Sequence, residues 1–219
     1  SLPIGRLFGI TVRVHLLFPF VAGGLILRAA WQKPPLPEGA WLDATVVMAL
    51  LFVSVVLHEF GHCFGARSVG GDAQDVLIWP LGGLANVEVP QNPRANLITA
   101  SCGPLVNLVL CVACGLLLYF AFSPGVQPGW NPLAGFQYRG NELIGHSAVP
   151  GMVLLPTWDG GAAPFAPYSL PVLLTHLFFV NWFLFVLNVV LIGFPLDGGR
   201  IFQSILWFII GYRQATFAA

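Results

Sequence analysis

Three ionisable residues in one short segment have the types and the spacing of a metal site. His58 and His62 are four residues apart and Glu59 follows the first histidine, in the pattern HExxH. On a helix, side chains at this spacing project from the same face, so the two imidazoles can share one metal ion. A glutamate beside the first ligand can reach a water in the open coordination position and take its proton. The pattern predicts hydrolytic chemistry at a zinc ion, with Glu59 as the general base.

The segment around this pattern is apolar enough to cross a bilayer. From residue 49 to residue 67 it reads ALLFVSVVLHEFGHCFGAR, and ionisable groups inside a membrane are costly and by default mark function. Of the whole chain, 57% is hydrophobic and only 8% charged, against about 25% charged in soluble domains. Nine basic and nine acidic residues cancel, which gives no reason to expect nucleic acid as a partner. We expect an integral membrane protein that works within the lipid bilayer.

Long apolar runs predict the helices that position the site. Another apolar helix begins after Arg200, and four earlier runs are long enough, with their flanks, to span a membrane. These four lie at about residues 14–27, 44–66, 95–122 and 170–192. The region from 123 to 169 is rich in Pro, Gly and aromatic residues and predicts a long external loop. We expect one membrane core over residues 1–219, with no regulatory domain visible.

A short region between the second and third spans breaks the helical pattern. Two β-prone runs, DVLIWPL and LANVEV, are separated by Gly82 and Gly83, which predicts a hairpin. Its edge could receive an extended peptide by strand addition. The predicted fold class is therefore an all-α polytopic membrane protein, with a bundle of about five transmembrane helices and a small membrane-associated β-hairpin.

The distribution of basic residues predicts the orientation. A cytoplasmic N-terminus and four spans divide the basic residues six to three in favour of the cytoplasmic side. The six are Arg6, Arg13, Arg67, Arg94, Arg200 and Arg213, and the three are Arg28, Lys33 and Arg139. We expect a multi-pass protein with its N-terminus and its active-site side in the cytoplasm.

The HExxH pattern lacks a third metal ligand. A catalytic zinc usually takes three protein ligands and keeps one position for water. In the HExxHxxGxxH arrangement the third ligand would be Ser68, a poor zinc ligand, and Glu88 is the one glutamate close behind the helix. Asp197 is favoured, because it is a carboxylate in an apolar neighbourhood, followed by Gly198 and Gly199, which let the backbone come close. Glu88, water and an unassigned group remain open as alternatives.

Four short sequence motifs, which include HExxH, follow one another along the chain. HEFGH, WPLGGLA, SCGPLVN and FPLDGGR together resemble the site-2 protease family of intramembrane zinc metalloproteases, and the resemblance covers nearly the whole chain. It implies a core of three helices that holds one zinc ion by His58, His62 and Asp197, with Glu59 as the base. It also implies cleavage of transmembrane protein substrates, usually after an earlier event has made them accessible.

The resemblance also suggests residues that contact the substrate. Asn188 matches the asparagine before the family's LDG, although NVVLIGFPLDG lacks the first proline of the usual NLLPxxPLDG and is one residue longer. Asn188 could hydrogen-bond the unwound substrate, and the hairpin around Gly82 and Gly83 could hold it extended. Asn107 needs a partner inside the bundle, where it serves either packing or the site.

Two other functions are compatible with the same residues. An ion or proton transporter could use His58, Glu59, His62, His176 and Asp197 as a path. A catalytically inactive relative could bind membrane helices without cleaving them, although an intact Glu59 argues against it. The sequence does not identify the substrate, and it leaves an oligomer open.

Overall fold

The computed structural model describes residues 1–31, 40–80, 82–122, 125–128, 138–139, 142–143, 153–159, 162–166, 168–190 and 196–218. The chain divides into two compact units. Unit 1 comprises Ser1–Leu25, Phe52–Asn107 and Leu184–Ala219, and unit 2 comprises Ile26–Leu51 and Leu108–Phe183. All the residues of the candidate site belong to unit 1.

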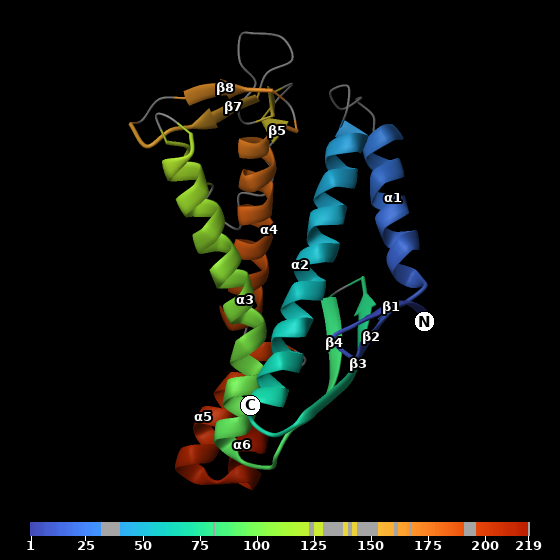
Figure 1. The fold of residues 1–219 in the computed structure, drawn as a ribbon, viewed down its shortest axis with the longest axis vertical. Helices are drawn as coiled ribbons and strands as arrows, with labels where there is room; N and C mark the ends of the chain where they lie inside the picture. The colour runs from blue at the N-terminus through green and yellow to red at the C-terminus, as the bar shows by residue number, and fades with distance from the viewer. Residues whose placement is uncertain are drawn as a thin grey trace. The chain divides into compact units, whose positions relative to one another are not determined.

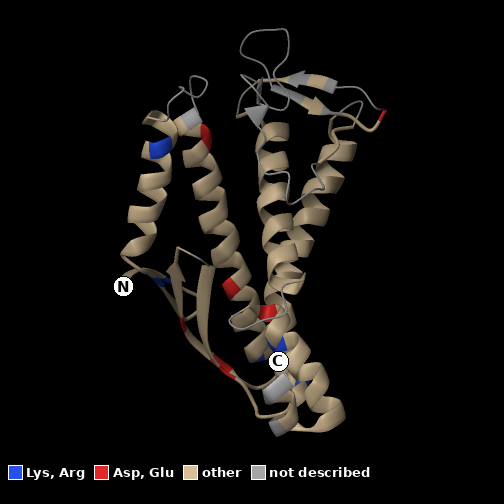
Figure 2. Ribbon diagram, turned by 180° about the vertical axis from the view of Figure 1, so that it is seen from behind, with Lys and Arg blue, Asp and Glu red and all other residues tan. Residues whose placement is uncertain are grey.

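Three helices of the described chain are long and apolar enough to cross a membrane (Figure 1). They are α2 (Ala40–Ser68), α3 (Pro93–Phe120) and α4 (Leu170–Val190). Figure 2 shows α3 and α4 almost free of charged residues, as a hydrocarbon environment requires. Asn92 caps α3 by accepting the Ala95 N–H at 2.8 Å, and Pro93 occupies the first turn, where its missing N–H costs nothing.

The remaining helices are shorter than the predicted bundle of five spans requires. Helix α1 (Leu17–Trp31) has 15 residues, and α5 (Asp197–Ile210) has 14. At about 1.5 Å per residue each is about 22 Å long, less than the roughly 30 Å of a hydrocarbon core. Helix α6 (Tyr212–Ala218) follows α5. The structure thus supports three of the predicted spans by length and composition.

A four-stranded sheet in unit 1 contains the predicted hairpin and two strands that were not predicted. The order is β1 (Leu2–Leu7), β2 (Ile10–Val14), β3 (Asp72–Trp79) and β4 (Gly82–Glu88). Strands β3 and β4 form the antiparallel hairpin, and β2 pairs with β3 in parallel. The first helix therefore begins later than residue 14, because the alternating, β-branched run ITVRV forms β2.

Hydrogen bonds from Arg67 link the sheet to the end of α2. Its guanidinium donates to the carbonyl oxygens of Phe8, at 2.7 Å, and Ala73, at 2.9 Å. Helix α2 ends at Ser68, and Gly70 takes the left-handed conformation, with φ of 81°, that lets the chain turn into β3. The sheet consequently lies beside the C-terminal half of α2 (Figure 1).

Unit 2 has its own apolar core. Cys111, Cys114 and Leu118 of α3 pack with Phe178 of α4, and all four are buried. The two cysteines are free thiols within this core, as their apolar neighbours would suggest. The predicted loop from 123 to 169 is not purely irregular, because it contains two short antiparallel pairs. These are β5 (Tyr138–Arg139) with β6 (Glu142–Leu143), and β7 (Val153–Pro156) with β8 (Ala162–Phe165).

Candidate metal centre

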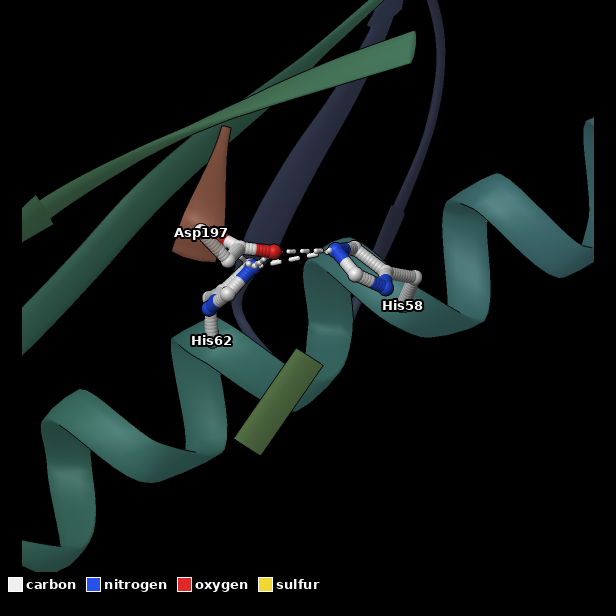
Figure 3. Close-up of side chains that lie close together, drawn as sticks. All are labelled: His58, His62 and Asp197. Atoms are coloured by element: carbon white, nitrogen blue, oxygen red, sulfur yellow. Dashed lines mark hydrogen bonds and ion pairs between the residues drawn. The ribbon is translucent and has the colours of Figure 1, made fainter. Parts of the chain in front are cut away.

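Three side chains from two helices direct ligand atoms at one point. His58 and His62 lie one turn apart on α2, and Asp197 is the first residue of α5 (Figure 3). The Asp197 Oδ2 atom is 3.0 Å from Nε2 of His58 and 3.2 Å from Nε2 of His62, and the two Nε2 atoms are 3.1 Å apart. The three residues are only 5%, 3% and 7% exposed. They form a buried group that could hold one metal ion.

The other nitrogen of each imidazole has its own partner. His62 Nδ1 lies 2.8 Å from the carbonyl oxygen of Thr99, and His58 Nδ1 lies 2.5 Å from Oδ1 of Asn107. A carbonyl oxygen only accepts, so Nδ1 carries the proton and a neutral imidazole presents a lone pair at Nε2. Such outer partners are usual for histidines that bind zinc.

This arrangement fits a cation. Two Nε2 lone pairs and a carboxylate at these distances would repel one another without positive charge between them. Two nitrogens and one oxygen are a ligand set that zinc accepts, and three protein ligands leave a position for water. An ionised Asp197 would supply the oxygen ligand of this set.

Glu59 lies between the metal group and the sheet. It is 5% exposed, and the backbone of Ala85 in β4 hydrogen-bonds to its carboxylate. The β4 backbone comes so close that a Cβ added at Gly83 would be 2.3 Å from Cγ of Glu59. Gly83 therefore leaves the space that the Glu59 side chain occupies.

A second glycine lets α3 approach the ligands. A Cβ added at Gly103 would be 2.3 Å from Nε2 of His62 and 2.8 Å from Nε2 of His58. On α2, a Cβ at Gly61 would be 2.6 Å from the carbonyl oxygen of Cys102. Helices α2 and α3 thus pack backbone to backbone at the site, and any side chain at 103 would meet the ligand nitrogens.

A cavity of about 120 Å³ opens beside the ligands. It reaches from the metal group along β4, where Gly82 and Gly83 line it, to Asn188 and Arg200. The Nδ2 atom of Asn188 donates to the carbonyl oxygen of Leu184 at 3.1 Å. The cavity thus lies beside the sheet and the start of α5.

The predicted site residues divide into two groups. His58, Glu59, His62 and Asp197 lie together, whereas the alternative ligand Glu88 is exposed at the end of β4. Among the proposed substrate contacts, Gly82, Gly83 and Asn188 line the cavity. Asn107 is fully buried against His58.

Three further residues at the site had not been singled out for it from the sequence, namely Thr99, Gly103 and Arg200. Thr99 acts through its backbone carbonyl, which no side-chain pattern can indicate. Gly103 lies in the SCGPLVN stretch, and Arg200 ends FPLDGGR, so the motifs contained both.

Comparison with known proteins decides the family. The model of peptidase family M50 matches residues 46–218, which include both histidines, Glu59 and Asp197. The chain belongs to peptidase family M50. It is 29% identical over 98% of its length to a protein of Synechocystis sp. named as a zinc metalloprotease, of which it covers 46%. It is 26% identical over 99% of its length to a zinc metalloprotease of Methanocaldococcus jannaschii, of which it covers 48%.

Further similarities agree with this membership. A protein of Mycobacterium tuberculosis named as the zinc metalloprotease Rip3 is 25% identical to this M50 chain. The match covers 94% of this chain and 44% of that protein. The chain thus spans about half the length of the curated relatives it matches. A site-2 protease structure from Methanocaldococcus jannaschii has the same fold, with a TM-score of 0.59 and 22% identity, and the match covers 100% of this chain and 77% of that one.

Proposed function

We propose that this M50 chain is an intramembrane zinc metalloprotease that hydrolyses peptide bonds in transmembrane segments of membrane proteins. The observation that carries the proposal is the convergence of two Nε2 atoms and one carboxylate on a buried point, with Glu59 alongside. Family membership favours this function over a transporter or an inactive binder, because the relatives are named as metalloproteases.

The chain's own residues supply binding and proton transfer. His58, His62 and Asp197 hold the zinc, with Asn107 and the Thr99 carbonyl fixing the two imidazoles. When bound, zinc lowers the pKa of a coordinated water and polarises the scissile carbonyl. Glu59 takes a proton from the attacking water and later delivers it to the leaving amine. Burial of the group restricts how much bulk water reaches these steps.

The edge of the sheet offers a place for the substrate. Strand β4 ends the order β1-β2-β3-β4, so one of its edges carries no partner strand within this sheet. The cavity runs along Gly82–Ala85 toward the metal group. We propose that an unwound stretch of substrate pairs with β4, because a peptide must be extended to expose its amides to attack. Asn188, which also lines the cavity, would hydrogen-bond the substrate backbone.

The placement in the membrane follows from the helices. Helices α2, α3 and α4 would cross the bilayer, while α1 and α5 would complete a bundle of five as short spans in a locally thinned bilayer. The excess of arginines favours a cytoplasmic N-terminus and active site. Residues 1–219 would act as one protease core, with the hairpin reaching membrane depth only where protein or water satisfies its backbone.

Two substitutions test the proposed function. Glu59→Gln should keep zinc at one ion per chain and reduce cleavage of a membrane substrate by several orders of magnitude, because Gln cannot accept the proton. Asp197→Ala should lower the zinc content itself, because it removes one of three ligands. Zinc is measured in the detergent-purified protein by mass spectrometry, and cleavage by gel assay. Cleavage by both variants at the wild-type rate would rule the assignment out.

A further inference from the structure

Arg200 places a positive charge beside the cavity, and this charge takes no part in the group of metal ligands. It lies one turn after Asp197 on α5 and is partly buried. Residues three apart on a helix share a face, yet the Asp197 carboxylate is bound to His58 and His62. Among the described residues, no ion pair or hydrogen bond of the Arg200 guanidinium is found. Arg200 lines the cavity, so its side chain can meet a molecule that enters it.

The location of Arg200 makes an uncompensated charge energetically unfavourable. Arg200 lines the same cavity as Glu59, Asp197 and the β4 backbone. A charge held at a partly buried site of a membrane protein is unfavourable unless something compensates it. Asn188 lines this cavity as well, and a peptide paired with β4 would present its carbonyls to the cavity.

The proposed reaction creates a negative charge at this place. Water forms a C–O bond to the carbonyl carbon as its proton passes to Glu59, and the electron pair of the C=O bond moves to the substrate oxygen. The C–O⁻ group then reforms the carbonyl as the C–N bond breaks, and the amine nitrogen receives the proton from Glu59. A preorganised donor that meets this oxygen stabilises the transition state more than the substrate, because the charge exists only there.

We propose that Arg200 is a catalytic residue of this reaction, whose guanidinium donates a hydrogen bond to the substrate oxygen as it becomes negative. This inference rests on the proposed protease function. The guanidinium suits the role because it offers five N–H donors in a planar arrangement. Its position on the first turn of α5 couples it to the same helix that carries Asp197, so the ligand and the donor move together.

Kinetics of Arg200→Gln and Arg200→Lys test the assignment. The probe substrate is a single apolar transmembrane helix in detergent micelles that the wild type cleaves. Removing one oxyanion donor typically costs about 10²- to 10³-fold in kcat, so Arg200→Gln should lose about that factor while KM stays within about threefold. Arg200→Lys, which keeps the charge, should recover part of kcat. A rise in KM with unchanged kcat would overturn the proposal, because it would make Arg200 a contact to the ground-state substrate.

Inhibitor binding gives a readout that does not depend on turnover. A peptide phosphonamidate carries a tetrahedral, negatively charged oxygen, whereas a hydroxamate of the same sequence binds chiefly through zinc. Arg200→Gln should weaken phosphonamidate binding by about tenfold or more and leave hydroxamate binding and zinc content at wild-type values. Equal losses for both inhibitors, or loss of zinc, would overturn the proposal in favour of a structural role.

The controls separate this proposal from the protease function itself. Arg94→Gln is the matched variant, because Arg94 belongs to the same unit but lines a different pocket, with Ser68 and Asn92. It should keep kcat and both inhibitor affinities. A wild-type protein that binds neither zinc nor hydroxamate would overturn the proposed function. If the wild type binds zinc and hydroxamate but Arg200→Gln has an unchanged kcat, the catalytic role of Arg200 is overturned and the proposed protease function is not.

Discussion

At the scale of single residues, the site depends on groups that hold the ligands rather than bind the metal. Asn107 is the clearest of these, because its Oδ1 atom fixes the Nδ1 proton of His58 and it is fully buried. Replacing such a partner typically lowers metal affinity by about 10- to 100-fold. We predict that Asn107→Leu lowers zinc affinity by this factor, as measured by competition with a chromophoric chelator.

The control keeps the accepting oxygen. Asn107→Asp retains an acceptor for His58 Nδ1 and should bind zinc more tightly than Asn107→Leu. Asn86→Leu removes an asparagine whose exposed side chain bonds to Asp75, outside the metal group, and should leave the affinity unchanged. If Asn107→Leu bound zinc as the wild type does, Asn107 would have no part in setting the tautomer of His58.

Gly83 makes a different residue-scale prediction, because it borders the base and not the metal. In Gly83→Ala the new methyl group would overlap Cγ and Cδ of Glu59, at 2.3 and 2.5 Å. The glutamate or β4 must shift, and a misplacement of about 1 Å can cost about 10²-fold in rate. We expect kcat to fall by about 10- to 100-fold with zinc content unchanged.

Gly5→Ala is the matched substitution in the same sheet. It also adds one methyl group to a strand, but no atom lies within 4 Å of the added Cβ. Its kcat should equal that of the wild type. A Gly83→Ala enzyme as active as Gly5→Ala would show that β4 does not restrict the position of Glu59.

At the scale of elements, the contact between α2 and α3 sets how close the backbone comes to the ligands. A Cβ on Gly103 would lie within 3 Å of both ligand nitrogens. Overpacking typically costs about 1–3 kcal/mol, which corresponds to about 5- to 150-fold in an equilibrium constant. Gly103→Ala should therefore weaken zinc binding by that range in the same chelator competition.

The same helix provides the control for this prediction. The Cβ of Gly115→Ala, also on α3, would lie 3.9 Å from Phe178, an ordinary contact. Zinc affinity should be unaffected in that variant. Equal zinc affinities for the Gly103 and Gly115 variants would contradict the close packing of α3 on the metal group.

The elements also show where the sequence was sufficient and where it was not. The apolar runs predicted α2, α3 and α4 because length and hydropathy alone define a spanning helix. Strand β2 was missed because one of its partners, β3, lies about 60 residues away, and such pairing leaves no local signal. Strand β1, which pairs with β2 as a hairpin, was missed with it. The HExxH spacing predicted which imidazoles share a face, but only the fold could show that Asn107 and the Thr99 carbonyl face them.

At the scale of the whole molecule, three long apolar helices predict that the chain stays in the membrane. Washing membranes with alkaline sodium carbonate releases peripheral proteins, but inserted helices stay because their apolar area would otherwise meet water. We predict that the chain remains in the pellet after the wash, as followed by immunoblot beside a soluble marker. Its release with the marker would show that α2, α3 and α4 do not span.

The chain spans about half the length of the curated relatives it matches. The three candidate metal ligands all belong to unit 1. The proposed hydrolysis therefore depends on a metal ion bound by these three residues.

Anomalous diffraction from crystals at the zinc absorption edge tests it most directly. We predict one peak per chain, about 2.0–2.2 Å from Nε2 of His58, Nε2 of His62 and a carboxylate oxygen of Asp197. No peak at this position in a zinc-replete crystal, or an Asp197 side chain turned away from the two imidazoles, would contradict the proposed metal centre and the hydrolysis that depends on it.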